Sequence, residues 1–143
     1  MIKIDNLQFG YGKQTVFTNI SLQFHEGQTY GLLGQNGVGK TTLLKLLSGL
    51  QKPDMGKIDI DGTAPWSRDP NLYAQEYFLE ENALIPNDVI LDYAKSVGNF
   101  YPHFDLEQFK QLADMFETRI DAKYNNLSSG QRKKALISLA LAL

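Results

Sequence analysis

The protein is a chain of 143 residues with a formal net charge of −2, 43% hydrophobic residues, 21% charged residues and no cysteine. These values are ordinary for a globular protein and argue against disorder or a fibrous repeat. The lack of a basic excess argues against binding to nucleic acid or to a membrane surface, so any phosphate chemistry has to come from a local site. Without cysteine, disulfides and thiolate metal sites are excluded.

The first part of the chain predicts strands around one helix. Alternating apolar residues indicate half-buried strands at 2–5, 20–24 and 58–60. Residues 29–33 form a short, nearly continuous apolar run, typical of a strand buried on both faces, and lead directly into a glycine-rich turn. The pattern from 40 to 50 is helical, with an inner face predicted to consist of Leu43, Leu44, Leu46 and Leu47.

The second part predicts helices. Asp105 and Gln108 have capping-box spacing before an apolar stripe that runs from Leu106 to Phe116. Ser128 and Gln131 repeat this spacing before a second helix at 132–143. The apolar stretch at its end is too short to span a bilayer, which favours a buried helix. The order of elements predicts an α/β fold with appended pieces.

A phosphate-binding loop is the strongest local pattern, because residues 34–41 fit G-x-x-x-x-G-K-[ST]. Its glycines let backbone N–H groups approach phosphate oxygens, and the following helix directs the positive end of its dipole at the same anion. The motif predicts binding of nucleotide phosphates with Mg²⁺, with Thr41 as a metal ligand, but by itself it leaves kinase, GTPase and ATPase open. The predicted nucleotide-binding residues are Gly34, Asn36, Gly37, Gly39, Lys40, Thr41 and Thr42.

A second pattern, the residues at 127–131, reads Leu-Ser-Ser-Gly-Gln and places a serine and a glycine at a helix N-terminus. Alone, it indicates an ordinary capped helix. Together with the phosphate loop, it resembles the ATP-binding cassette (ABC) family, whose signature usually reads L-S-G-G-Q; the resemblance spans nearly the whole chain. It implies that two cassettes pair head to tail and that each signature contacts ATP held by the partner. The residues carried over are Ser128, Ser129, Gly130 and Gln131, and Ser129 departs from the usual glycine.

The resemblance also assigns residues outside both motifs. Tyr11 occupies the place of the family's aromatic residue that stacks on adenine. Glu80 stands where the family's Q-loop usually has glutamine, because Gln75 lies five residues too early in that frame. Glu80 is therefore predicted, with Lys40, to serve catalysis and, with Thr41, to hold Mg²⁺. The segment 80–88 is predicted to dock on a membrane partner, and the glutamate points weakly towards export.

The family resemblance implies a P-loop NTPase (RecA-like) core with an N-terminal antiparallel β-subdomain and a small α-helical subdomain. The whole of 1–143 would be a partial ABC ATPase domain, in which the Walker B strand, its catalytic acids and later elements are absent. This absence predicts an open sheet, weak ATP binding and negligible hydrolysis by these residues alone. The expected parts are a β-subdomain at 1–27 and 57–64, the P-loop strand, loop and helix at 28–56, and the Q-loop, helical subdomain and signature helix at 80–143.

The function implied is that of the ATP-binding subunit of an ABC transporter. Its expected partners are a second cassette, identical or different, and a transmembrane permease, which would place it in the cytoplasm at the inner face of the membrane; nucleic acid is not expected. An alternative is a soluble ABC ATPase that acts on ribosomes or DNA. The short spacing between Glu80 and Leu127 leaves no room for the long coiled coil of DNA-repair cassettes. An unrelated P-loop kinase would leave the signature unexplained.

Overall fold

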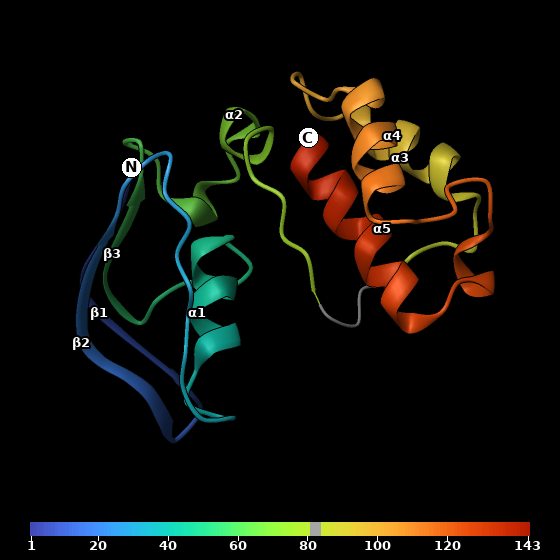
Figure 1. Cartoon of the computed structure of the whole chain (residues 1–143). Coiled ribbons are helices and arrows are strands. Elements are labelled where there is room, and N and C mark those ends of the chain that lie inside the picture. The colour runs from blue at the N-terminus through green and yellow to red at the C-terminus, as the bar shows by residue number, and fades with distance from the viewer. Residues whose placement is uncertain (81–83) are drawn as a thin grey trace. The chain divides into compact units, whose positions relative to one another are not determined.

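The computed structural model describes residues 1–80 and 84–143 and consists of two compact units, Met1–Tyr73 and Ala74–Leu143 (Figure 1). The first unit holds the strands and the phosphate-binding loop, and the second holds the longer helices. Each unit has its own hydrophobic core.

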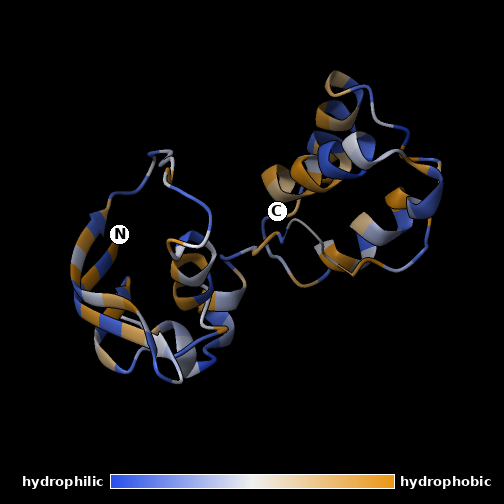
Figure 2. Ribbon diagram, turned by 90° about the horizontal axis from the view of Figure 1, so that it is seen from below, coloured by the Kyte–Doolittle hydropathy of each residue, from blue (hydrophilic) through white to orange (hydrophobic). Residues whose placement is uncertain are grey.

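The first unit is built on a three-stranded antiparallel sheet with the order β2-β1-β3. Strand β1 is Ile2–Tyr11, β2 is Gln14–Phe24 and β3 is Met55–Ile60. The strands predicted from alternation are thus confirmed, and hydrophobic and hydrophilic residues alternate along them in Figure 2. The buried core of this unit comprises Ile4, Leu7, Phe9, Phe17, Leu43, Leu46, Ile58, Ile60 and Leu72.

An irregularity in β1 lets the strand bury residues of both odd and even number. Ile4 and Leu7 are both inside, although strict alternation would place them on opposite faces. Asn6 between them has a φ of 49°, and the register with β2 shifts at this point. Gly56 faces the irregularity, where a Cβ would lie 2.4 Å from the Asn6 carbonyl oxygen. The chain therefore uses a bulge to continue its core along one strand.

Helix α1, Lys40–Leu47, packs on this sheet through Leu43 and Leu46 (Figure 1). The prediction that Leu44 lies inside is wrong, because its residue is 46% exposed. One helical stripe reaches the sheet, and Leu44 is rotated about 100° from Leu43. The helix ends before residue 50 because Gly49 adopts a φ of 69°, which ends a helix.

The chain returns from β3 through two short helical segments that complete the first core. Segment η1, Pro65–Ser67, places the half-buried Trp66 against the core. Helix α2, Pro70–Tyr73, adds the buried Leu72. These segments therefore extend the core beyond the sheet and α1.

The strand predicted at 29–33 is the main difference in this unit, because residues 28–33 have no regular secondary structure. A strand needs a partner for its backbone N–H and C=O groups, and no strand within the described residues pairs with this segment. Its side chains are correspondingly open, and Leu33 is 93% exposed. Residues 29–33 thus have the apolar composition of a strand, but no neighbouring strand in the described part of the chain accepts their hydrogen bonds.

The second unit contains α3, Ile90–Gly98, α4, Leu106–Met115, the short η2, Tyr124–Asn126, and α5, Ser129–Ala142. The predicted helices α4 and α5 are confirmed, although α5 begins at Ser129 rather than Arg132. Helix α3 escapes prediction because Val89 at its start makes no side-chain cap. The buried core of this unit comprises Ile90, Ala94, Phe109, Ala122, Leu127, Ala135, Leu139 and Ala142.

No helix among residues 1–80 and 84–143 is long and apolar enough to cross a membrane.

Candidate functional site

The loop before α1 is shaped by glycines in conformations that other residues rarely adopt. Gly37 has a φ of 83° and Gly39 a φ of 106°. At Gly39 there is also no space for a side chain, because a Cβ would lie 2.7 Å from the Val16 side chain and 2.9 Å from the Phe17 ring. The turn into the helix therefore depends on glycine for both conformation and packing.

The N-terminus of α1 is open. Gly39 is the N-cap residue and offers no side-chain oxygen, and the first intrahelical bond joins the Leu43 N–H to the Gly39 carbonyl at 2.8 Å. The N–H groups of Lys40, Thr41 and Thr42 precede this bond, so the helix supplies them with no carbonyl. Such an N-terminus attracts an anion through its N–H groups and its dipole.

The Lys40 side chain closes over the loop that precedes it. Its ammonium group donates hydrogen bonds to the carbonyls of Gly34 at 2.7 Å and Gln35 at 2.8 Å. The positive charge thus lies beside the loop, held by neutral carbonyls. An incoming phosphate can compete for this ammonium by offering charged oxygens in place of neutral carbonyls.

A cavity of about 250 Å³ connects the loop to the tip of the β1–β2 hairpin. Tyr11 forms one wall; it is 48% exposed, and its ring meets that of Phe9 edge-on with 5.0 Å between centroids. A flat aromatic ring beside an anion site suits a nucleotide base next to its phosphates. The lining residues are Tyr11, Gln14, Val16, Asn36, Gly37, Gly39, Lys40, Thr41 and Thr42.

The structure therefore brings Tyr11 together with most of the loop residues identified from the motif. Gly34 is not in the cavity wall but holds Lys40 through its carbonyl. Gln14 and Val16 were not identified from the sequence, since neither belongs to a motif. What could have indicated them is their place in the chain, because β2 begins with Gln14, directly after the turn that follows Tyr11.

A nucleoside triphosphate with Mg²⁺ is chemically compatible with this cavity. The N–H groups at the start of α1 and the Lys40 ammonium suit phosphate oxygens, and Tyr11 offers a stacking surface. Among the lining residues, the Thr41 hydroxyl is an oxygen ligand of the kind that Mg²⁺ accepts alongside phosphate oxygens and water. Across the described part of the chain, no group of three or more His, Asp or Glu could hold a metal without such help.

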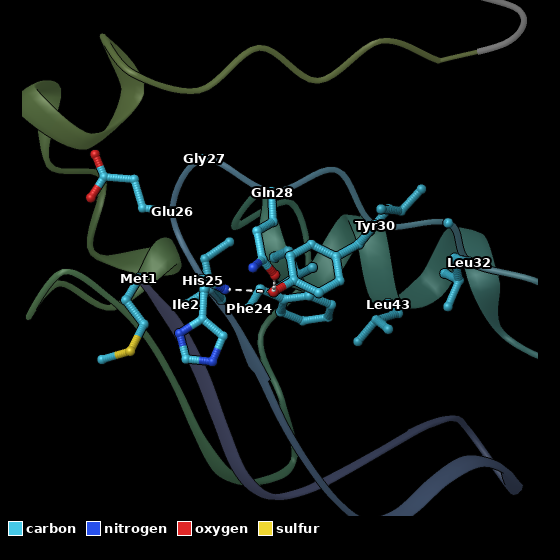
Figure 3. Close-up of a pocket in the computed structure, with 13 residues that line it drawn as sticks. Met1, Ile2, Phe24, His25, Glu26, Gly27, Gln28, Tyr30, Leu32 and Leu43 are labelled. Carbon is cyan, nitrogen blue, oxygen red and sulfur yellow. Dashed lines mark hydrogen bonds between the residues drawn. The ribbon is translucent and has the colours of Figure 1, made fainter.

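A larger cavity of about 440 Å³ in the same unit has a different character (Figure 3). It lies where the chain from β2 to residue 32 passes α1, and Leu32, Leu43 and Leu44 contribute to its apolar wall. The Tyr30 hydroxyl accepts from the His25 N–H at 2.9 Å and donates to the Gln28 side chain at 2.6 Å. Because its wall is largely apolar, this cavity offers little to a phosphate.

The first turn of α5 carries the second predicted motif and is closed by its own side chains. The Ser128 hydroxyl accepts from the Gln131 N–H at 3.3 Å, and the Gln131 side chain accepts from the Ser128 N–H at 3.2 Å. This is a complete capping box. Ser129 and Gly130 are exposed, and a Cβ at Gly130 would meet nothing within 4 Å. The fold thus gives no steric reason for a glycine there.

Glu80 is exposed and belongs to the second unit, whereas Thr41 belongs to the first. Their joint role in holding Mg²⁺ stays a prediction. Of the segment 80–88 predicted as a docking surface, residues 81–83 lie outside the described residues.

Tyrosines anchor the segment that leads to Glu80 within the second unit. The Tyr101 hydroxyl donates to the Glu76 carbonyl at 2.9 Å, and the rings of Tyr77 and Tyr101 meet edge-on with 6.0 Å between centroids. Burial, reinforced by neighbouring tyrosines, raises the pKa of Tyr77 well above its usual range. Burial also raises the pKa of Glu76. These groups are therefore held in their protonated forms more strongly than in water.

A glycine-shaped loop that opens a helix, with a lysine folded over it and an aromatic wall beside it, defines the first unit as a P-loop nucleotide-binding module. The family model described as ABC transporter matches residues 17–143. The chain belongs to the ABC transporter family.

Individual relatives agree with this family. The chain is 32% identical to the sulfate/thiosulfate import ATP-binding protein CysA of Mannheimia succiniciproducens, over 99% of this chain and 42% of the relative. It is also 32% identical to the energy-coupling factor transporter ATP-binding protein EcfA1 of Mycoplasmopsis pulmonis, over 100% of this chain and 58% of that protein. The chain thus spans roughly half the length of these curated relatives.

Solved structures show the same fold. A putative ABC transporter ATP-binding protein from Pyrococcus furiosus has a TM-score of 0.85 and 27% identity, over 99% of this chain and 70% of that one. A bacterial ABC transporter cassette solved as a dimer has a TM-score of 0.79 and 26% identity, over 99% of this chain and 69% of that one. The same cassette has been solved in a dimeric post-hydrolysis state bound to ADP and Pi.

Proposed function

We propose that the whole protein is the ATP-binding subunit of an ABC transporter, which couples ATP binding and hydrolysis to the work of a membrane partner. The observation that carries the proposal is the cavity shared by Tyr11, the open N-terminus of α1 and Lys40. An adenine ring on Tyr11 would leave the phosphates facing the loop. Family membership narrows the reaction of such a loop to that of an ATPase.

In this proposal Lys40 and Thr41 act on the terminal phosphates. The Lys40 ammonium would exchange its carbonyl partners for β- and γ-phosphate oxygens and stabilise the charge that develops during phosphoryl transfer. The Thr41 hydroxyl would help to hold Mg²⁺, whose charge would offset the negative charge of the phosphates. Glu80 is the further Mg²⁺ ligand that the family resemblance implies.

The first turn of α5 would contact ATP held by a second cassette. Glycine at a helix start is less stable than alanine, and the space around Gly130 gives no internal reason for this cost. An external group that approaches the backbone closely supplies one. Ser128 and Ser129 are exposed on the same turn, and Gln131 is half-buried there. The dimeric cassette among the structural neighbours is consistent with this arrangement.

The remaining partner would be a transmembrane permease that docks on the segment 80–88. This partner would hold the protein at the cytoplasmic face of the membrane, with export as the direction that Glu80 favours. The relatives include the ATP-binding protein of a sulfate/thiosulfate import system, so the direction of transport needs its own assay.

Titration with a fluorescent ATP analogue and Mg²⁺ tests the central step. Lys40→Ala should weaken binding at least tenfold, which corresponds to about 1.4 kcal/mol. Lys57→Ala is the matched control, because Lys57 is an exposed residue of β3 outside the cavity. Equal binding by the folded wild type and Lys40→Ala proteins would refute the proposed nucleotide site.

A further inference from the structure

Arg132 makes more contacts than its place in a basic helical turn predicts. Its Nε donates to the Tyr124 carbonyl at 3.0 Å, and a terminal guanidinium nitrogen donates to the Asn125 carbonyl at 2.9 Å. The guanidinium carbon also lies 4.9 Å from the centre of the Tyr124 ring. One side chain of α5 thus holds two consecutive carbonyls and one ring of η2.

The turn held by Arg132 leads directly into the signature. The Leu127 N–H donates to the Tyr124 carbonyl at 3.2 Å, and the Leu127 side chain is buried in the second core. Ser128 follows as the N-cap, and its own carbonyl accepts from the Arg132 N–H at 2.9 Å. The chain between Tyr124 and Arg132 is therefore a closed loop fixed at both ends, with Ser128 inside it.

The same turn is tied to the end of the predicted docking segment. The Tyr124 N–H donates to the Asp88 carbonyl at 2.9 Å, and the Asn125 N–H donates to the Asn87 side chain at 3.0 Å. A β-bridge between Val89 and Lys123 continues this contact. The N–H groups of Tyr124 and Asn125 therefore bond to the docking segment, and the carbonyls of the same two residues accept from Arg132.

We propose that Arg132 is a positioning residue that joins the docking segment at Asn87 and Asp88 to Ser128 of the signature. A displacement of the docking segment moves the η2 turn, and the guanidinium passes this movement to the first turn of α5. The inference rests on the proposed function, because it assigns to Ser128 a contact with ATP of a second cassette.

Arginine is specifically suited to this position. Its planar fork presents separate N–H groups to two carbonyls while its face covers an aromatic ring. A lysine ammonium has the same charge and can donate to carbonyls, but it lacks the planar fork that meets two carbonyls in a fixed geometry while its face covers a ring. Arg132→Lys therefore keeps the positive charge of the turn and weakens the contacts between α5 and η2. Arg119→Lys is the matched control, because Arg119 precedes the same turn, its side chain is 69% exposed, and it pairs with the nearby Asp121.

The test is a double-mutant cycle on ATP hydrolysis, measured on the protein at its full natural length. Arg132→Lys is expected to lower kcat by about fivefold and to leave KM for ATP within about twofold, since its contacts lie outside the nucleotide cavity. Ser128→Ala also lowers kcat. In the Ser128→Ala background, Arg132→Lys should have no further effect, because it acts through Ser128.

The outcomes separate the inference from the proposed function. If Arg132→Lys lowers kcat equally with and without Ser128, its role is one of general stability and the inference is overturned while the proposed function stands. If Arg132→Lys changes nothing, the inference alone is overturned in the same way. If Ser128→Ala hydrolyses ATP like the wild type, or the folded wild type hydrolyses none, the proposed function fails and the inference fails with it.

Discussion

The N-termini of α1 and α5 present two different solutions to the same physical problem. Both helices begin with N–H groups that have no carbonyl one turn back. At α1 the N-cap is Gly39, which has no side chain to offer, so the helix start stays open to a ligand. At α5, Ser128 and Gln131 close a capping box within the chain. The open helix start leaves its N–H groups available to a ligand, whereas at the closed one a side chain of the chain itself already accepts from an N–H group.

The largest expected effect is at Gly39. Gly39→Ala should lower the free energy of unfolding of the first unit by about 3 kcal/mol, because alanine would combine a strained φ with a collision against Val16 and Phe17. Urea unfolding measures this loss, and titration with the ATP analogue should show weakened binding.

Gly37→Ala is the matched control for that experiment. Gly37 has a φ of 83°, but a Cβ there would meet nothing within 4 Å, so we expect a loss of about 1 kcal/mol from strain alone. Equal losses from the two substitutions would show that packing against β2 does not determine the open helix start.

The next effect concerns the closed helix start. Ser128→Ala should reduce the stability of the first turn of α5 by about 1 kcal/mol, because the Gln131 N–H loses its acceptor. Amide hydrogen exchange in residues 129–133 measures this loss. Ser129→Ala is the control, since Ser129 is exposed and does not cap the helix. Unchanged exchange in Ser128→Ala would mean that the capping box contributes nothing in solution.

The smallest effect has the opposite sign. Gly130→Ala should stabilise the start of α5 by about 0.5 kcal/mol, because alanine is the better helix former and a Cβ there has open space. The same exchange experiment reports it. A clear loss of stability would show that the fold itself requires this glycine, and would remove one argument for an external contact at the signature.

Much of the fold follows from patterns that involve neighbouring residues. Alternation indicates the three strands, and the capping residues Asp105 and Ser128 mark the starts of α4 and α5. Sequence patterns do not show whether an apolar run has a partner, which is why residues 29–33 were predicted as a strand. They also do not show which side of α1 meets the sheet, so Leu44 was placed inside.

The candidate site also has a part that a local motif predicts and a part that only the fold brings together. The loop at 34–42 is predictable because its motif residues stand at fixed spacing within one short segment. Gln14 and Val16 enter the cavity only because the β1–β2 hairpin brings them there. The two hydrogen bonds of the Arg132 side chain are directed at backbone carbonyls, and carbonyls exist at every residue. No choice of side chain at Tyr124 or Asn125 therefore signals those bonds in advance.

The placement of Trp66 has an optical consequence. It is the only tryptophan in the sequence, and it packs against the core of the first unit. Its emission therefore reports on the strands and α1 and is silent about the core around α5. Circular dichroism reports on every helix. A comparison of the two signals during thermal melting can therefore show whether the two units unfold together or one after the other.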